Sequence, residues 1–270
     1  MSAAAPPQAA NRPSQGGRDA SALAHAAARL GGIIPPSGAL YLVPNLLGTV
    51  APGSVVPAGT LEVARSITHW VVETPKAARA FLKTLDLPVP IAALDVRALG
   101  DAPSTAELAA LLAPARAGKP VGLLSDAGCP GIADPGAALV AAAHAASVTV
   151  VPLVGPSAVL LALMASGLNG QSFAFHGYLP QGSDARAIAL RRLEGESRAL
   201  KRAQLFIETP YRNVAMLESI IATLAPATRV CVAADLTLPS QSVLTLPVSG
   251  WRRRDLRAYA KRPALFVLQA

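Results

Sequence analysis

Short apolar strands that alternate with helices constrain the fold of this 270-residue chain more than any other feature. The runs 39–43, 69–73, 120–124 and 148–154 are rich in Val and Leu, and helical patterns fill most of the sequence between them. Strands that are apolar along most of their length are buried on both faces, which is typical of a parallel sheet covered by helices. The chain is therefore predicted to be an α/β protein with a mostly parallel N-terminal sheet.

The pattern changes after residue 154. Further strands are predicted at 173–179, 203–208, 229–235, 241–248 and 264–269, around helices near 185–200 and 211–224. Strands and helices no longer alternate regularly there, so we expect a second α/β domain with a mixed sheet. The predicted organisation is a mobile tail over 1–37, which is rich in Ala, Pro, Gly and Ser without an apolar period, an N-terminal domain over 38–154 and a C-terminal domain over 155–270.

Several classes of protein are excluded. Residues 135–183 carry no Asp, Glu, Lys or Arg, yet two prolines and two glycines between 152 and 167 cut this run into pieces too short to span a membrane. Cys129 and Cys231 lie far apart and form no metal-ligand or disulfide pattern. The start MSAAAPPQAA lacks the basic and apolar regions of a secretory signal. We expect a cytoplasmic protein with no bound metal and no membrane contact.

The charge is unevenly distributed along the chain. The net charge is +8, and residues 1–180 hold ten Lys and Arg against nine Asp and Glu, whereas residues 181–270 hold fourteen against seven. Such an excess suits a polyanion, because Lys and Arg that neutralise phosphates release condensed counterions. RNA is therefore a predicted partner of the C-terminal half, with Arg252, Arg253 and Arg254 as candidate contacts. No aromatic residues are interleaved with the basic ones, so a merely solvated surface remains the alternative.

Three turns rich in glycine or proline follow predicted strands. They are PNLLG at 44–48, SDAGCPGIADPG at 125–136 and GPSA at 155–158. A loop with several glycines costs conformational entropy on folding, so a binding role accounts for it better than a simple connection does. Ligands of open parallel sheets bind at the carboxyl ends of the strands. The three turns are therefore predicted to line one crevice.

The order and spacing of six segments resemble a known group of enzymes. LYLVPNLLG, VVET, LLSDAGCPGIADPG, VVPLVGPSAVLLALMASGL, FAFHGYLP and LFIETPYR together resemble the tetrapyrrole methylase superfamily, and within it the branch that methylates small-subunit ribosomal RNA. The resemblance covers about residues 39–240. It implies a homodimer of two-domain chains that transfers a methyl group from S-adenosylmethionine, held in a cleft between the domains, to the ribose 2′-hydroxyl of a cytidine.

The resemblance also implies where the cofactor binds. Backbone groups of the three turns would surround it, and glycines there let a ligand approach the main chain because no Cβ intrudes. The free amides at the helix start after residue 156 suit a carboxylate. The implied cofactor-binding residues are Pro44, Leu47, Gly48, Ser125, Asp126, Gly128, Pro130, Gly131, Ile132, Pro156, Ser157 and Ala158.

Methyl transfer to a hydroxyl depends on positioning, and it benefits from a general base or a nearby cation. Glu73, Glu208 and Arg212 are the candidate catalytic residues, and Tyr211 is a candidate substrate contact. Each has a structural alternative: Glu73 at a strand end is equally suited to capping the next helix. Asp126 is similarly suited to bonding its own turn amides.

Two further interpretations stay open because the chain departs from the family pattern. No acidic residue follows the turn at 44–48 before Glu62, and VETPK replaces the family's usual AEDTR run. The segment 235–240 lacks the usual Lys and paired glutamates. One alternative is methyl transfer to a small molecule such as a tetrapyrrole precursor. The other is a binding protein that has lost catalysis.

Overall fold

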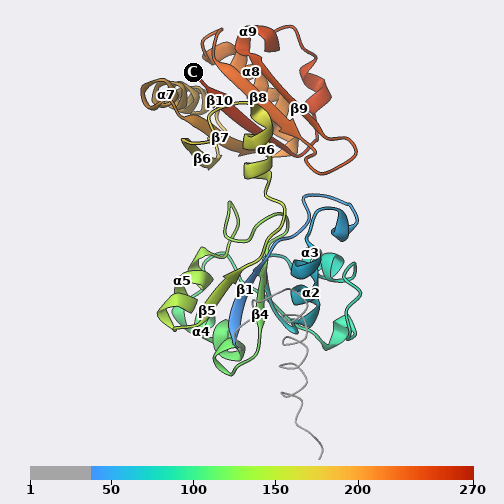
Figure 1. The fold of residues 1–270 in the computed structure, drawn as a ribbon. Helices are drawn as coiled ribbons and strands as arrows, with labels where there is room; N and C mark the ends of the chain where they lie inside the picture. The colour runs from blue at the N-terminus through green and yellow to red at the C-terminus, as the bar shows by residue number, and fades with distance from the viewer. Residues whose placement is uncertain (1–37) are drawn as a thin grey trace, which may run out of the picture. The chain divides into compact units, whose positions relative to one another are not determined.

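The computed structural model describes residues 38–270, and the predicted tail over 1–37 lies outside this range. The described chain forms two compact units, shown in Figure 1. The first unit contains residues 38–43, 58–124 and 136–153, and the second contains Pro44–Pro57, Ser125–Pro135 and Val154–Ala270. All three predicted ligand-binding turns follow strands of the first unit, yet apart from Gly136 they group with the second.

The first unit is built around a parallel five-stranded sheet in the order β3-β2-β4-β1-β5. Its strands are β1 (Ala39–Val43), β2 (His69–Val72), β3 (Asp95–Ala98), β4 (Val121–Leu124) and β5 (Thr149–Pro152). Its helices are α2 (Ala58–Ser66), α3 (Pro75–Leu82), α4 (Thr105–Arg116) and α5 (Ala137–Ala145), and a 3-10 turn, η2, spans Ile91–Ala93. In Figure 1, α4 and α5 lie on one side of the sheet and α2 and α3 on the other. The predicted parallel sheet, covered on both faces, is confirmed.

Close packing in this unit explains one glycine in the middle of β4. A Cβ added to Gly122 would lie 2.6 Å from the ring of Trp70 on the neighbouring strand β2. Trp70 is only 1% exposed, and its indole Nε1 donates a hydrogen bond to the carbonyl oxygen of Ile67. The ring therefore cannot shift cheaply, and the position accepts only glycine.

The second unit holds a mixed five-stranded sheet in the order β6-β7-β10-β8-β9. Its strands are β6 (Phe173–Tyr178), β7 (Ala203–Glu208), β8 (Arg229–Ala234), β9 (Ser242–Pro247) and β10 (Ala264–Gln269). β6 and β7 are parallel, whereas β10 runs antiparallel to both β7 and β8, and β9 runs antiparallel to β8. The predicted mixed sheet is confirmed. The carboxyl ends of β6, β7 and β8 lie at one edge, beside the start of β10.

Two apolar cores cover the two faces of this sheet. The helices α7 (Ser183–Leu200) and α8 (Asn213–Thr223) pack on one face with the short helix α9 (Val248–Trp251), and α6 (Ala158–Ser166) packs on the other. Figure 1 shows α6 lying across the sheet. The remaining 3-10 turns are η1 (Pro52–Ser54), η3 (Pro210–Arg212) and η4 (Leu256–Tyr259).

Candidate functional site

Asn45 joins the first two turns. Its backbone N–H donates to the carbonyl oxygen of Gly128 at 2.8 Å, and its side-chain Nδ2 donates to the carbonyl oxygens of Ser125 and Asp126 at 2.9 and 3.0 Å. The residue is only 5% exposed. Buried amide hydrogen bonds of this kind hold a loop in one conformation, because breaking them would leave carbonyl groups without partners.

The glycines of the 125–136 loop are required by its backbone. Gly128 has φ +69° and Gly131 has φ +79°, in the left-handed region that side chains disfavour. A Cβ on Gly128 would also lie 3.3 Å from a methyl carbon of Leu47, in the first turn. The loop is therefore fixed by the conformation of its glycines and by close contact with the neighbouring turn.

The third turn packs against the other two. A Cβ added to Gly155 would lie only 2.4 Å from Cβ of Pro44, and the thiol of Cys129 donates to the carbonyl oxygen of Pro156 at 3.6 Å. Burial raises the pKa of the Cys129 thiol, which disfavours the reactive thiolate. The three predicted turns thus lie together within the second unit, and Cys129 serves there as a small side chain.

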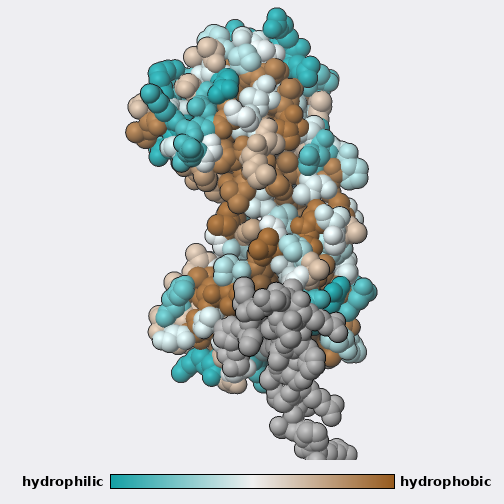
Figure 2. Space-filling view, in the orientation of Figure 1, coloured by the Kyte–Doolittle hydropathy of each residue, from teal (hydrophilic) through white to brown (hydrophobic). Residues whose placement is uncertain are grey.

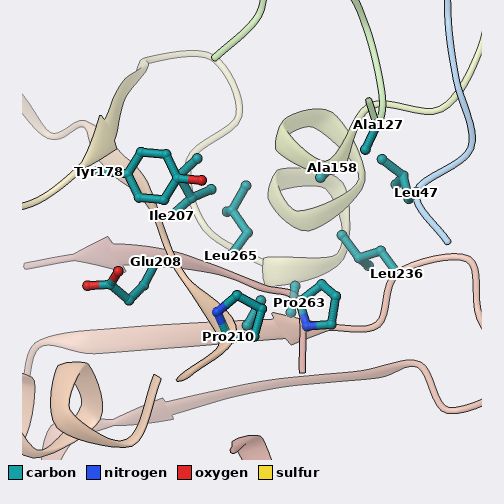
Figure 3. Close-up of a pocket in the computed structure, with 12 residues that line it drawn as sticks. Leu47, Ala127, Ala158, Tyr178, Ile207, Glu208, Pro210, Leu236, Pro263 and Leu265 are labelled. Carbon is teal, nitrogen blue, oxygen red and sulfur yellow. The ribbon is translucent and has the colours of Figure 1, made fainter. Parts of the chain in front are cut away.

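A pocket of about 250 Å³ opens beside these turns at the edge where β6, β7 and β8 end (Figure 3). All its lining residues belong to the second unit, and most of them are apolar. Figure 3 shows Tyr178 and Glu208 on one side and Leu47 and Leu236 on the other. The lining residues are Leu47, Ala127, Ala158, Tyr178, Ile207, Glu208, Pro210, Ala233, Leu236, Pro263, Ala264 and Leu265.

The predicted cofactor-binding residues divide into two sets. Leu47 and Ala158 line the pocket. Gly48 does not line it, but it packs closely in the first turn, where a Cβ would come within 2.7 Å of the Leu238 side chain. The other nine predicted residues belong to the same three turns, but they are not among the described residues that line this pocket. They are Pro44, Ser125, Asp126, Gly128, Pro130, Gly131, Ile132, Pro156 and Ser157.

Glu208 and Arg212 form an ion pair at the end of β7. Glu208 Oε1 accepts hydrogen bonds from Arg212 Nη2 at 2.6 Å, from Arg212 Nε at 2.9 Å and from the backbone N–H of Thr209 at 2.7 Å. The Glu208 side chain is fully buried and that of Arg212 is 29% exposed. The other carboxylate oxygen, Oε2, is buried without a hydrogen-bond partner among the described residues. The pair therefore places a buried, charged hydrogen-bond acceptor at the end of β7.

The remaining predicted residues lie elsewhere. Glu73 follows β2 in the first unit, where its backbone N–H donates to the carbonyl oxygen of Leu124 at 3.1 Å. Tyr211 is 82% exposed, next to the lining residue Pro210. The three arginines 252–254 are exposed at the end of α9 and do not line the pocket described here. Figure 2 shows hydrophilic surface around α7 and α9 of the second unit.

No family model matches the chain. Ribosomal RNA small subunit methyltransferase I of Escherichia coli O157:H7 is 33% identical over 221 residues, which are 81% of this chain and 73% of that protein. The protein of the same name from Vibrio cholerae is 32% identical over 216 residues, 79% of this chain and 71% of the other.

The chain belongs to this family, a branch of the tetrapyrrole methylases. Members of the family are methyltransferases that use S-adenosylmethionine as the methyl donor. The crystal structure of the methyltransferase CobJ matches with a TM-score of 0.57 at 20% identity, over 86% of this chain and 94% of that one. This match confirms the predicted tetrapyrrole-methylase fold.

Most of the pocket wall in this family member, nine of the twelve described lining residues, was not predicted from the sequence. Tyr178 and Ile207 line the pocket from segments that carried the family resemblance, but neither was singled out as a site residue. Leu236, Pro263 and Leu265 also line it, and none of them was singled out either. The signal that finds them is topological, because β6, β7 and β8 end at the same edge and ligands bind at such carboxyl ends. In addition, Asp235 and Thr237, which flank Leu236, both have positive φ.

Two classes of feature are absent from the described range. Nowhere in residues 38–270 do three or more His, Cys, Asp or Glu side chains gather as metal ligands. None of the helices in that range has both the length and the apolar character that crossing a bilayer requires.

Proposed function

We propose that this protein transfers a methyl group from S-adenosylmethionine to a ribose 2′-hydroxyl of small-subunit ribosomal RNA. The observation that carries the proposal is the 33% identity, over 221 residues, to an enzyme named for that RNA. A fold alone would not support a substrate, since one fold serves many reactions. The excess of Lys and Arg after residue 180 supports a polyanionic substrate independently.

The pocket suits part of the cofactor. Its volume of about 250 Å³ lies just below the range of about 300–1,000 Å³ found for small-molecule sites, so it suits a moiety such as the adenosine better than the entire molecule. Its walls are mostly apolar, and Glu208 is the one carboxylate among the described lining residues. When bound, S-adenosylmethionine supplies a methyl group on a sulfonium. The three turns around Gly48, Gly128 and Pro156 would hold it.

The acceptor hydroxyl needs a group that takes or shares its proton. Glu208 is the only carboxylate among the residues that line the described pocket, and Arg212 beside it supplies the positive charge that would stabilise a developing alkoxide. Glu73, at the end of β2, is the second proposed acidic residue. We propose that Glu208 or Glu73 accepts a hydrogen bond from the acceptor hydroxyl. Arg212 would stabilise the negative charge that develops on its oxygen.

Methyl transfer to a small molecule is the second candidate. It is favoured by the mostly apolar pocket wall, on which Glu208 is the one charged residue of those described. The structure adds no observation in favour of a binding protein that has lost catalysis. An assay of turnover distinguishes that interpretation from the two methyltransferase interpretations.

The test measures labelled methyl transfer from S-adenosylmethionine to small ribosomal subunits prepared from cells that lack this protein. We expect label in the ribosomal RNA, on a ribose, and micromolar calorimetric binding of S-adenosylhomocysteine at one site per chain. Ala158→Phe should lower that affinity at least about tenfold, because a phenyl ring in place of a pocket-lining methyl group occupies the cavity. Ala165→Phe is the control, at an exposed position of the same helix α6.

Three results contradict the proposal in different ways. Transfer to a small molecule but not to RNA supports the second candidate. Cofactor binding without transfer to any acceptor supports the binding-protein interpretation. Equal affinities of the two phenylalanine variants would place the cofactor outside this pocket.

A further inference from the structure

Two tyrosine rings stand in solvent beside the pocket. Tyr211 is 82% exposed and Tyr178 is 59% exposed, although the chain has only four tyrosines and the other large aromatic side chains of the described residues are mostly buried. Exposed aromatic rings leave apolar surface in water, which is unfavourable unless a partner covers it. The position of these two rings therefore needs an account.

Both rings belong to the edge at which β6 and β7 end. Tyr178 is the last residue of β6, pairs with Ile207 of the parallel strand β7, and lines the pocket. Tyr211 is the middle residue of η3, between Pro210, which lines the pocket, and Arg212, which is paired with Glu208. Tyr178 is visible at the side of the pocket in Figure 3. A molecule that extends out of the pocket along this edge would meet both rings.

The backbone of Lys261 is held against η3, the turn that carries Tyr211. The backbone N–H of Lys261 donates to the carbonyl oxygen of Pro210 at 2.9 Å, and Lys261 is exposed with φ +61°, a conformation that is uncommon for a residue with a side chain. The fully buried Asn213 fastens the same segment, because its Nδ2 donates to the carbonyl oxygens of Tyr259 and Arg262 at 3.1 and 2.6 Å. The segment that carries Lys261 is thus tied to η3 and to the start of α8.

We propose that Tyr211 is a stacking platform for a nucleobase of single-stranded RNA, and that Lys261 contacts a phosphate of the same strand. Single-stranded RNA is bound by aromatic rings that stack on unpaired bases and by cations that follow the backbone. An exposed ring on η3 and an exposed lysine whose backbone is bonded to η3 can provide both contacts next to the pocket. This inference rests on the proposed function and names the contacts by which the RNA is held at that site.

The first test uses fluorescence anisotropy with a fluorescein-labelled, 12-nucleotide single-stranded RNA and the full chain. Tyr211→Ala is expected to weaken binding about tenfold, within the range observed for loss of one base stack. Tyr211→Phe should bind like the wild type, because stacking needs the ring and not the hydroxyl. Leu200→Ala is the matched control, since Leu200 is a large apolar residue, 56% exposed, at the end of α7. Calorimetric binding of S-adenosylhomocysteine should be unchanged in all three variants.

The second test measures the salt dependence of the same binding. Lys261→Gln should lower the slope of log affinity against log salt concentration by about 0.7, the contribution of one phosphate contact on a single strand. Lys201→Gln is a close control, because Lys201 is also exposed and also left-handed, with φ +50°, but follows α7. Equal slopes for the two glutamine variants would overturn the role of Lys261.

The failures of this inference and of the proposed function are distinguishable. If the wild type methylates the small subunit and binds the RNA, and Tyr211→Ala binds equally well, the stacking role is wrong and the proposed function stands. If the wild type neither binds the RNA nor methylates ribosomal RNA, the proposed function is wrong and this inference falls with it.

Discussion

At the residue scale, the ion pair of Glu208 and Arg212 differs from the other pairs of the second unit in its burial. The Glu208 side chain has no exposed surface, whereas Arg192 and Glu196 on α7 form an equivalent i,i+4 pair with exposures of 62% and 31%. A buried charge that loses its partner pays its full desolvation cost, while an exposed charge is rehydrated. Glu196 also pairs with Arg202 at 3.1 Å, so the exposed carboxylate keeps a partner when Arg192 is removed, and the comparison sets a buried single pair against an exposed network.

Arg212→Ala is expected to lower the free energy of unfolding by about 3 kcal/mol, because it leaves the Glu208 carboxylate buried without a countercharge. Arg192→Ala should cost less than about 1 kcal/mol, the usual worth of a surface pair. Urea denaturation followed by circular dichroism measures both. Adding Glu208→Gln to Arg212→Ala should recover part of the loss. Equal costs for the two arginine variants would show that the buried pair contributes no more than the exposed one.

Single residues also mark the limit of prediction at the site. The sequence pointed to Gly128 and Gly131, whose positive φ explains why no other residue suits them. It did not point to Asn45, whose three hydrogen bonds join two turns about eighty residues apart in the chain. Periodicity and local motifs do not indicate which distant backbone groups an amide side chain will contact. Hydrogen bonds between residues so far apart in the sequence could therefore be found only in the structure.

At the element scale, the strands with an apolar sequence were predicted and one strand, β3, was missed. β1, β4, β7 and β10 are buried along most or all of their length, and the sequence identified them. β3 was missed because its residues, DVRA, include an Asp and an Arg that pair with each other on a half-exposed strand at the edge of the sheet. An edge strand buries less apolar surface, so its sequence gives a weaker signal.

Helix α4 begins at a capping box that the spacing of Ser104 and Glu107 predicted. The Ser104 hydroxyl accepts a hydrogen bond from the Glu107 N–H at 3.3 Å, and the Glu107 carboxylate accepts one from the Ser104 N–H at 2.7 Å. Hydrogen bonds from the Ser104 hydroxyl and then from its backbone N–H lower the pKa of Glu107. The folded state thus favours the ionised carboxylate.

Ser104→Ala should lower the free energy of unfolding by about 1 kcal/mol at pH 7, the usual cost of losing an N-cap side chain. The pKa of Glu107 is lower in the folded state than in the unfolded state. The ionised carboxylate therefore stabilises the folded protein at every pH above the unfolded pKa. This stabilisation is lost as the pH falls through the folded pKa. The difference between wild type and variant should therefore shrink in acid. Urea denaturation at pH 7 and near pH 3 measures it, with Ser104→Thr as the control that keeps the cap. If the stability difference between wild type and Ser104→Ala does not change with pH, the ionised Glu107 carboxylate does not contribute to the cap.

At the scale of the whole molecule, the excess positive charge and most of the pocket lie in the same part of the chain. Residues after 180 carry most of the excess of Lys and Arg, and they supply most of the pocket wall. A substrate with many phosphates is attracted to such a surface before any specific contact forms. The predicted homodimer stays a prediction, and sedimentation velocity would test it.

The charge asymmetry leads to a prediction about RNA affinity. Replacement of Arg252, Arg253 and Arg254 by Ala removes three exposed cations from the second unit, and replacement of Arg79, Lys83 and Arg116 by Ala removes three exposed cations from the first. Both triple variants change the net charge equally. If long-range attraction by total charge governed binding, they would weaken it equally.

We expect the triple variant at 252–254 to bind small-subunit ribosomal RNA more weakly at low salt. Its slope of log affinity against log salt concentration should fall by up to about 2, because each phosphate contact on a single strand contributes about 0.7. The triple variant of the first unit should keep most of the wild-type slope. Filter binding between about 50 and 200 mM salt measures both, a range over which several phosphate contacts change affinity by orders of magnitude. If the two slopes are the same, the arginines after α9 are ordinary solvated surface, and RNA contacts must be sought on other residues.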